Sequence, residues 1–371
     1  MKRILFVIGT RPEIIKTAPV ILEFKNDISY KVGVCVTGQH KVMAQQMLSV
    51  FGIVPDYDLK LMRDKQSLDY IASSALANLK KVYEEFKPSF VFVQGDTTTA
   101  FCAALSAYYS KIRVAHIEAG LRTYDKFEPF PEELNRAMIS RIADIHFAPT
   151  KLSKENLIKE NISEKTIVIT GNTAIDALFY VRKKVESFSD NELNERIGGR
   201  KVILVTAHRR ENLGEPLENI CNALKKIAQK HKDYLVVYPI HLNPKVLNTV
   251  KPMLEGIDNI LLIEPLCYKD FVLLMSRAYL ILTDSGGIQE EAPSLGVPVL
   301  ILRDRTERPE VVEAGCAIIV GTDTEAIVSN CSKLLESSEI YESMSKSQNP
   351  VGDGTAAVKI KKILDEQFKG E

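Results

Sequence analysis

One stretch of the chain decides the fold class: Tyr279-Leu280-Ile281-Leu282-Thr283-Asp284-Ser285-Gly286-Gly287-Ile288-Gln289-Glu290-Glu291-Ala292. An apolar run leads into a turn of small residues, after which a helical segment begins. This order predicts a buried strand that passes through a tight turn into a helix, the repeating unit of parallel α/β sheets. Ser285, Gly286 and Gly287 would also let backbone N–H groups approach a diphosphate at the start of that helix. The alternative is a structural turn in which Ser285 is only an N-cap.

The same alternation of short apolar runs and helical segments extends along the whole chain. In the first half, the apolar runs predict strands at Ile4–Ile8, Val32–Val36, Phe90–Val93, Val114–Ile117, Ile145–Ala148 and Ile167–Ile169. In the second half, they predict strands at Val202–Val205, Leu235–Val237, Ile260–Ile263, Leu280–Leu282, Val299–Leu302 and Ile318–Val320. Between the strands, segments such as Leu68–Phe86 carry apolar residues at the spacing of one helix face.

A seam divides this series into two similar halves. After Gly171-Asn172-Thr173, a polar segment predicts a helix over Arg182–Arg196, and a new strand opens after Gly198-Gly199. A chain of 371 residues also exceeds the size at which one hydrophobic core keeps growing. We therefore expect two Rossmann-like α/β domains that face a cleft, with ligands at the carboxyl ends of the strands. The expected domains are residues 1–172 plus 355–371, and residues 173–354.

The composition restricts the possible partners. The 48 basic and 48 acidic side chains cancel, whereas nucleic-acid and membrane-surface proteins usually carry a basic excess. The six cysteines are scattered, and no apolar run approaches the roughly 20 residues that cross a bilayer. These features predict a cytoplasmic protein with reduced cysteines that binds neither nucleic acid nor membrane. No His, Cys and Asp spacing predicts a metal site.

Basic side chains follow two of the predicted strands. Arg308 lies in the arginine-rich segment Arg303–Glu310, and guanidinium groups suit phosphate. Arg11 and Lys16 lie at the start of a helix, where cations oppose the helix dipole and therefore indicate a second anion contact. The alternative is two solvated surface charges. Because the turn reads Gly9-Thr10-Arg11-Pro12 and lacks the GxGxxG fingerprint, no nicotinamide cofactor is expected.

Acidic residues follow strands in the first half. Asp96 and Glu118 come after consecutive predicted strands, so a parallel sheet would bring both carboxylates to one edge. Neighbouring carboxylates can have their pKa values pushed apart, which yields one acid and one base. Glu132 and Glu133 lie in Pro129–Arg136. The alternatives are an N-cap role for Asp96 and a helix-dipole role for Glu132 and Glu133.

Two of the six histidines follow strands in the second half. His208 and His241 are expected at the ligand-binding edge of that sheet, because they come directly after apolar runs. His146 and His231 are expected to be structural or surface residues.

Together these blocks resemble the non-hydrolysing UDP-N-acetylglucosamine 2-epimerases. The matching blocks run in order over nearly the whole chain: Gly9–Lys16, Thr37–His40, Gln94–Asp96, Ile117–Arg122, Pro129–Arg136, Thr206–Asn212, Tyr238–Pro244, Thr283–Glu291 and Arg308–Glu310. The resemblance implies a glycosyltransferase-B-type fold whose C-terminal helix, Thr355–Phe368, crosses back to the first domain. It also implies a homodimer that makes a precursor of cell-surface polysaccharides.

The resemblance further implies the reaction and its residues. UDP-N-acetylglucosamine and UDP-N-acetylmannosamine would interconvert by elimination and re-addition of UDP through a 2-acetamidoglucal intermediate, without a cofactor. The implied catalytic residues are Asp96, Glu118, Glu132 and His208. The implied UDP contacts are Arg11, Lys16, Phe271, Ser285, Gly286, Gly287, Glu291 and Arg308. Bacterial relatives also bind a second UDP-N-acetylglucosamine as activator, and the residues compatible with such a site are Gln39, His40, Gln66, Glu133, Arg210 and His241.

The chain departs from the family pattern at a few positions. Val42 and Lys65 stand where glutamine and arginine are expected in the activator site, and Leu266 stands where some relatives have glutamine near uracil. Three other functions share part of the pattern: a UDP-sugar glycosyltransferase, a hydrolysing 2-epimerase and a non-enzymatic UDP-sugar sensor. The set of three carboxylates favours the epimerase, because a transferase could work with one base and carboxylates near a diphosphate weaken simple binding.

Overall fold

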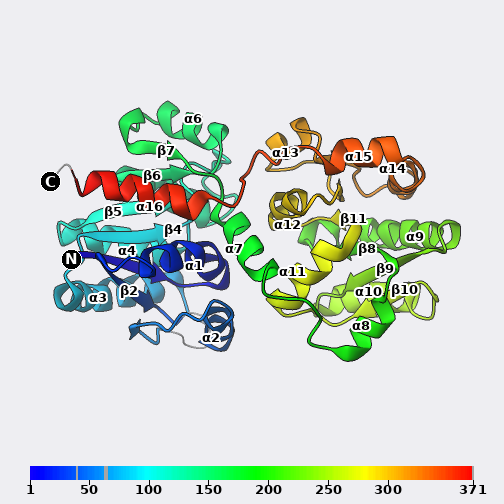
Figure 1. Ribbon diagram of the computed structural model, residues 1–371, viewed down its shortest axis with the longest axis horizontal. Coiled ribbons are helices and arrows are strands. Elements are labelled where there is room, and N and C mark those ends of the chain that lie inside the picture. The colour runs from blue at the N-terminus through cyan, green and yellow to red at the C-terminus, as the bar shows by residue number, and fades with distance from the viewer. Residues whose placement is uncertain (39–40, 62–65, 370–371) are drawn as a thin grey trace. The chain divides into compact units, whose positions relative to one another are not determined.

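The computed structural model describes residues 1–38, 41–61 and 66–369 (Figure 1). The chain divides into two compact units, residues 1–180 with 352–371, and residues 181–351. The first break lies beyond the expected boundary at residue 172, within helix α7 (Thr173–Arg182). This helix stays with the first unit because its Asp176 accepts hydrogen bonds from Ala356 N at 3.3 Å and Ala357 N at 2.9 Å.

The first unit contains a seven-stranded parallel sheet in the order β3-β2-β1-β4-β5-β6-β7. Its strands are β1 (Lys2–Ile8), β2 (Tyr30–Val36), β3 (Tyr57–Asp58), β4 (Phe90–Gln94), β5 (Arg113–Ile117), β6 (Ile145–Ala148) and β7 (Ile167–Ile169). In the ladder between β4 and β5, Gln94 lies opposite Ile117. The residues that follow these two strands therefore emerge at one edge of the sheet, as expected for Asp96 and Glu118.

Helices cover the first sheet on both faces. They are α1 (Arg11–Lys25), α2 (Lys41–Val50), α3 (Leu68–Phe86), α4 (Thr98–Tyr109), α5 (Glu132–Ile142), α6 (Lys151–Lys159), α7 and α16 (Ala356–Gln367). Side chains of successive strand residues point to opposite faces. Leu5 and Val93 accordingly pack in the cluster that includes residues of α3 and α4. Phe6 instead stacks on Phe92, with 4.6 Å between the ring centroids. Both lie on the face where Phe24 of α1 packs.

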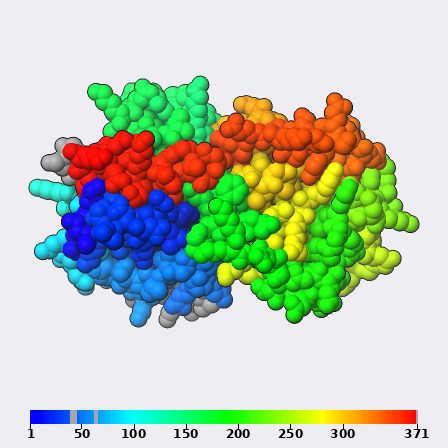
Figure 2. Space-filling view, viewed as in Figure 1, coloured from blue at the N-terminus to red at the C-terminus, as the bar shows by residue number. Residues whose placement is uncertain are grey.

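Helix α16 returns to the first unit, as the resemblance implied. It lies against α1, and the two segments are adjacent in both views (Figures 1 and 2). Asp365 accepts hydrogen bonds from Tyr30 Oη at 2.6 Å and Lys2 Nζ at 3.1 Å. Lys361 pairs with Asp27 at 2.9 Å. These polar contacts fix the helix over the N-terminal strands.

The second unit contains a six-stranded parallel sheet in the order β10-β9-β8-β11-β12-β13. Its strands are β8 (Lys201–Thr206), β9 (Tyr234–Pro239), β10 (Ile260–Ile263), β11 (Ala278–Thr283), β12 (Val299–Ile301) and β13 (Ala317–Ile319). Its helices are α8 (Asn191–Ile197), α9 (Glu215–Lys230), α10 (Pro244–Leu254), α11 (Tyr268–Arg277), α12 (Gly286–Glu291), α13 (Pro309–Glu313), α14 (Thr324–Glu336) and α15 (Ser338–Ser345). Both sheets have the parallel α/β architecture predicted from the sequence.

One predicted helix is wrong in extent. The polar segment expected to be helical over Arg182–Arg196 contains only the end of α7 and most of α8. Asp190 starts α8 by accepting a hydrogen bond from Glu192 N at 2.9 Å. Before it, Phe188 is buried, and Ser189 N donates to Asp270 at 3.0 Å. These contacts hold the preceding backbone in a non-helical path.

Among the described helices, none is both long and apolar enough to span a bilayer.

Candidate active-site residues

Glu118 is a buried acidic residue of the first unit with a constrained backbone. It directly follows β5 in the left-handed region at a φ of 64°, and 6% of its side chain is exposed. Its Oε1 accepts hydrogen bonds from Lys16 Nζ and, at 3.1 Å, from Asn172 Nδ2, while its Oε2 accepts one from Gln94 Nε2. Left-handed backbone costs a residue with a Cβ about 1–2 kcal/mol. Such strain in a well-packed fold is typical of functional positions.

Asp96 lies at the same sheet edge, in a different environment. Its Oδ2 pairs with Arg136 Nη2 at 2.5 Å, and 25% of its side chain is exposed. Burial raises the pKa of the Asp96 carboxyl and the nearby Glu118 raises it further, whereas Arg136 and Lys16 oppose the rise. Asp96 and Glu118 therefore interact electrostatically while making different hydrogen bonds. That arrangement allows two carboxyl groups to take opposite roles in proton transfer.

The N-cap alternative for Asp96 is wrong. Thr97 is the N-cap of α4, and its Oγ1 accepts a hydrogen bond from Ala100 N at 3.0 Å. The turn before it is fixed by His116, whose Nε2 donates to the Gly95 carbonyl oxygen at 2.8 Å. Burial lowers the pKa of His116 to about 3, so this imidazole is neutral. His116 received no role from the sequence, yet it supports the backbone next to Asp96.

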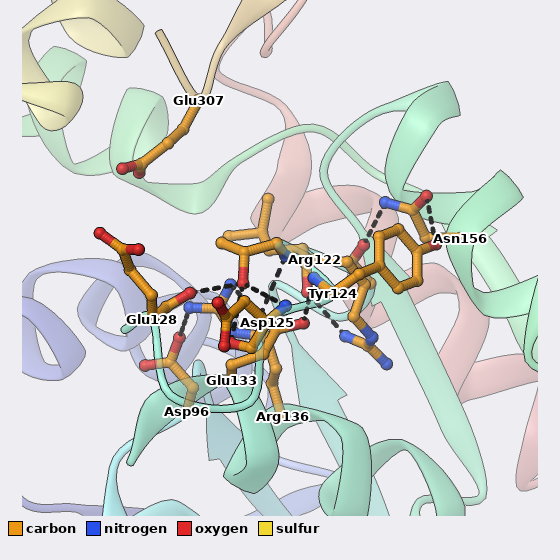
Figure 3. A network of polar contacts seen from close by, with 12 residues as sticks. Asp96, Arg122, Tyr124, Asp125, Glu128, Glu133, Arg136, Asn156 and Glu307 are labelled. Carbon is orange, nitrogen blue, oxygen red and sulfur yellow. Dashed lines mark hydrogen bonds and ion pairs between the residues drawn. The ribbon is translucent and has the colours of Figure 1, made fainter. Parts of the chain in front are cut away.

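Glu132 and Glu133 occupy the first turn of α5 but differ in their contacts. The Glu133 side chain is buried, and its two oxygens accept hydrogen bonds from Tyr124 N at 2.9 Å and Thr123 N at 3.1 Å. Its Oε2 also lies 3.2 Å from Arg136 Nη1 (Figure 3). The half-buried Glu132 carboxylate has no ion-pair or hydrogen-bond partner within the described part of the chain. Glu133 thus fixes the backbone of Thr123 and Tyr124 and pairs with Arg136.

Glu13 is a buried acidic residue that the sequence interpretation missed. Its Oε2 accepts hydrogen bonds from Gly9 N at 3.1 Å and Thr10 N at 2.6 Å, and its Oε1 accepts one from Thr97 Oγ1 at 2.9 Å. It thereby joins the turn that carries Arg11 to the turn that carries Asp96. Burial raises the pKa of Glu13 to about 7 against the opposing effect of these donors. The spacing of Thr10 and Glu13 is that of a capping box, which was the available signal.

In the second unit, Asp284 organises the segment that carries His208. The Asp284 side chain is fully buried at the end of β11, and its Oδ2 accepts from His208 N at 2.7 Å and Arg209 N at 2.8 Å. Asn212 Nδ2 donates to the same oxygen at 3.0 Å. The His208 ring stacks on the His241 ring, with 5.1 Å between their centroids. Burial lowers the pKa of His208, and the stacked His241 adds to this effect, whereas Asp284 opposes it.

The small-residue turn lies at the same edge of the second sheet. Ser285 is at the N-cap position of α12 but its side chain makes no capping bond, so the plain N-cap interpretation does not explain the serine. A Cβ at Gly287 would meet no atom within 4 Å, and one at Gly286 would meet only Arg209 Nη2, at 3.8 Å. Packing within the described chain therefore does not require glycine at either position. Glycines that packing does not require suit a backbone that a ligand approaches closely.

The remaining predicted residues lie in both units. Arg11 is the first residue of α1, and Phe271 lies in the first turn of α11. Arg308 forms an ion pair with the buried Glu290 of α12, and the partly exposed Glu291 is the last residue of that helix.

The residues suggested for an activator site are dispersed over the sequence. Arg210 and His241 are exposed in the second unit, and Gln66 precedes α3 in the first. Gln39 and His40 lie outside the described residues. Within the described ranges, no group of three or more His, Cys, Asp and Glu side chains is placed to hold a metal ion.

Comparison with known proteins places these residues in context. The sequence matches the family described as UDP-N-acetylglucosamine 2-epimerase over residues 22–365. It is 52% identical to the UDP-N-acetylglucosamine 2-epimerase of Campylobacter jejuni, over 98% of this chain and 97% of that protein. It is 49% identical to the Escherichia coli (strain K12) enzyme of the same name, over 98% of each. The structure is similar to that of the Neisseria meningitidis UDP-GlcNAc 2-epimerase bound to UDP-GlcNAc, with a TM-score of 0.87, 47% identity and coverage of 98% and 100%.

Proposed function

Because the chain belongs to the UDP-N-acetylglucosamine 2-epimerase family, we propose that it interconverts UDP-N-acetylglucosamine and UDP-N-acetylmannosamine. One structural observation carries the proposal beyond the family name: Asp96 and Glu118 lie at one sheet edge in different electrostatic environments. No carbonyl is adjacent to C2 of the sugar, so its proton is not acidic enough for simple exchange. Proton removal must therefore be coupled to departure of a leaving group.

The proposed reaction balances as an elimination followed by an addition. A carboxylate of the first unit takes the C2 proton, the C2–H electron pair becomes a C1–C2 double bond, and the C1–O bond breaks with its electrons leaving on UDP. In the return step, UDP adds to C1 and a carboxyl group delivers a proton to the opposite face of C2. Two faces require two proton-transfer groups, which we assign to Asp96 and Glu118. Glu132, at the start of α5, is the third catalytic carboxylate of the proposal.

Groups of the second unit are proposed to hold the departing diphosphate. Gly286 and Gly287 would donate backbone N–H groups to such an anion at the start of α12, where the helix dipole favours negative charge. Ser285 would donate its hydroxyl, because its own N–H donates to Thr283 Oγ1 at 2.9 Å. His208 and Arg308 would supply further hydrogen bonds to the phosphates, and Glu291 would bind the ribose. Phe271 would border the uracil, while Arg11 and Lys16 would contact the ligand from the first unit. The Neisseria meningitidis relative with UDP-GlcNAc bound supports this substrate class.

The biological setting is part of the same proposal. We infer a cytoplasmic homodimer that supplies an amino-sugar nucleotide for cell-surface polysaccharides, as the family resemblance implies. A second molecule of UDP-N-acetylglucosamine would act as activator through the residues that the resemblance suggested: Gln39, His40, Gln66, Glu133, Arg210 and His241. Sedimentation of the purified protein and initial rates at rising substrate concentration test the two parts, since activation predicts a sigmoidal curve.

Proton NMR of UDP-N-acetylglucosamine incubated with the enzyme in deuterated water tests the reaction. The expected result is UDP-N-acetylmannosamine with deuterium at C2 of both sugars. Release of free N-acetylmannosamine would indicate a hydrolysing enzyme, and no exchange at C2 without an acceptor would indicate a transferase. Asp96→Asn and Glu118→Gln should each slow exchange to a low residual rate while sparing UDP binding. Glu155→Gln, at an exposed position of α6, is the matched control and should exchange at the wild-type rate.

A further inference from the structure

Arg136 contacts two carboxylates with two different nitrogens. Its Nη2 lies 2.5 Å from Asp96 Oδ2, and its Nη1 lies 3.2 Å from Glu133 Oε2 (Figure 3). Only 12% of the side chain is exposed, and Nε is buried without a hydrogen-bond partner in the described part of the chain. A guanidinium devoted to one carboxylate would use two N–H groups on it. Arg136 is therefore shared between two carboxylates instead of gripping one of them with two N–H groups.

Glu133 in turn fixes the backbone of the segment between β5 and α5, residues 121–131. Its carboxylate receives the N–H groups of Thr123 and Tyr124, and Thr123 Oγ1 donates to the Glu128 carbonyl oxygen at 2.5 Å. Farther from α5, Tyr124 Oη donates to Asn156 Oδ1 at 2.9 Å (Figure 3). This segment, which we call the 121–131 loop, is thus tied to Asp96 through Glu133 and Arg136.

The aromatic side chains of the loop are exposed, although the polar contacts that hold its backbone are buried. Its aromatic side chains Tyr124, Phe127 and Phe130 are 61%, 67% and 62% exposed, and the loop leads directly into Glu132. Its backbone is therefore held by polar anchors and not by burial of these aromatic side chains: the contacts to Glu133, and the buried Arg122, which pairs with Glu160 at 2.6 Å. Loss of the Glu133 contacts would release the Thr123 and Tyr124 backbone N–H groups and remove one of the two partners of Arg136.

We propose that Arg136 is a positioning residue for the epimerisation, which orients the Asp96 carboxylate and makes that orientation depend on the conformation of the 121–131 loop. The inference rests on the proposed function, because it assigns Asp96 to proton transfer. Charged groups that face Asp96 are Arg136 on α5, Lys16 on α1 and Glu118 after β5. Without Arg136, only Lys16 among these groups would oppose the rise in the pKa of Asp96 that burial and Glu118 cause. Asp96 would then accept a proton at a higher pH, and its carboxylate would no longer be held in one orientation.

A double-mutant cycle tests the inference. Arg136→Gln should lower kcat roughly 100-fold, comparable to the loss of one preorganised electrostatic contact, and move the acidic limb of its pH profile to higher pH, with KM changed little. In the Asp96→Asn background, Arg136→Gln should cause no further loss, because the arginine acts through that carboxylate. Arg141→Gln, at an exposed position on the same helix, is the matched control and should keep the wild-type profile.

Hydrogen exchange tests the loop. Arg136→Gln and Glu133→Gln should each speed amide exchange in a peptide covering residues 121–131, whereas Arg141→Gln should not. Arg136→Lys, which keeps the charge but can reach one carboxylate only, should retain the fold and show an intermediate kcat.

The positioning role would be overturned if the two substitutions reduced kcat independently, so that their effects multiplied in the double variant. It would also be overturned if Arg136→Gln left both the acidic limb of the pH profile and the amide exchange of residues 121–131 unchanged. Full turnover by Asp96→Asn would instead refute the assignment of Asp96 in the proposed function.

Discussion

The buried carboxyl group of Glu13 makes the stability of the first unit depend on pH. Burial raises its pKa from 4.5 to about 7. The folded state therefore binds more protons than the unfolded state between these two values, so the free energy of unfolding falls as the pH rises across that window. Because one pKa unit corresponds to about 1.4 kcal/mol, the loss amounts to about 3 kcal/mol between pH 4.5 and about 7.

The substitution Glu13→Gln removes the titration while keeping the size of the side chain. The amide oxygen can still accept the N–H groups of Gly9 and Thr10, and Thr97 Oγ1 can turn to accept from the amide nitrogen. Near pH 4.5 the variant and the wild type should have similar stability. Above pH 7 the variant should be the more stable protein, by up to about 3 kcal/mol.

Native-state hydrogen exchange of a peptide spanning α1 measures this difference within the first unit, at pH steps from 5 to 8 and with correction for the intrinsic exchange rate. Glu84→Gln, on the exposed face of α3, is the control and should not alter the pH dependence. A stability difference that stays constant with pH would refute the reasoning. A variant that is less stable above pH 7 would show that the three donors outweigh burial and that Glu13 is ionised in the folded protein.

Two other substitutions test the geometry of the sites. Gly120→Ala should destabilise the first unit by roughly 3 kcal/mol or more in urea unfolding, because the new Cβ would lie 2.1 Å from the Ser153 carbonyl oxygen at a φ of 92°. Gly52→Ala, at a φ of 66° with nothing within 4 Å, should cost only about 1 kcal/mol, and an equal loss in both would contradict the steric explanation. Asp284→Asn should speed amide exchange over residues 206–212 and lower kcat roughly tenfold, because an amide is a weaker acceptor for three donors than a carboxylate; unchanged exchange would count against the organising role of Asp284.

Local sequence patterns predicted most of the fold. The helix Leu68–Phe86 and the strand Ile145–Ala148 have the bounds expected from their apolar spacing. Such patterns work because buried elements need apolar residues at a fixed period. Strand β3 was missed because two residues carry no period, and the segment before α8 was misassigned because contacts distant in sequence override a polar helical pattern.

The candidate site was predictable only where its residues follow strands. Asp96 and Glu118 meet because the ladder between β4 and β5 brings the ends of those strands together. Arg136 carried no signal of its own, because its link to Asp96 depends on how α5 packs at that edge. Asn172 and Gln94 also contact Glu118 from positions distant in the sequence, Gln94 because β4 pairs with β5. Sequence spacing therefore indicated which residues reach the edge but not which partners they find there.

The return of α16 to the first unit has a consequence for biosynthesis. A ribosome makes residues 1–180 first, then the whole of the second unit, and only afterwards the segment that covers α1. The first unit therefore emerges with part of its surface still open to water. This is the apolar and charged surface that Ile360 and Lys361 later cover. Its completion depends on translation through the intervening residues, so nascent chains that stall within the second unit expose this surface to chaperones and proteases.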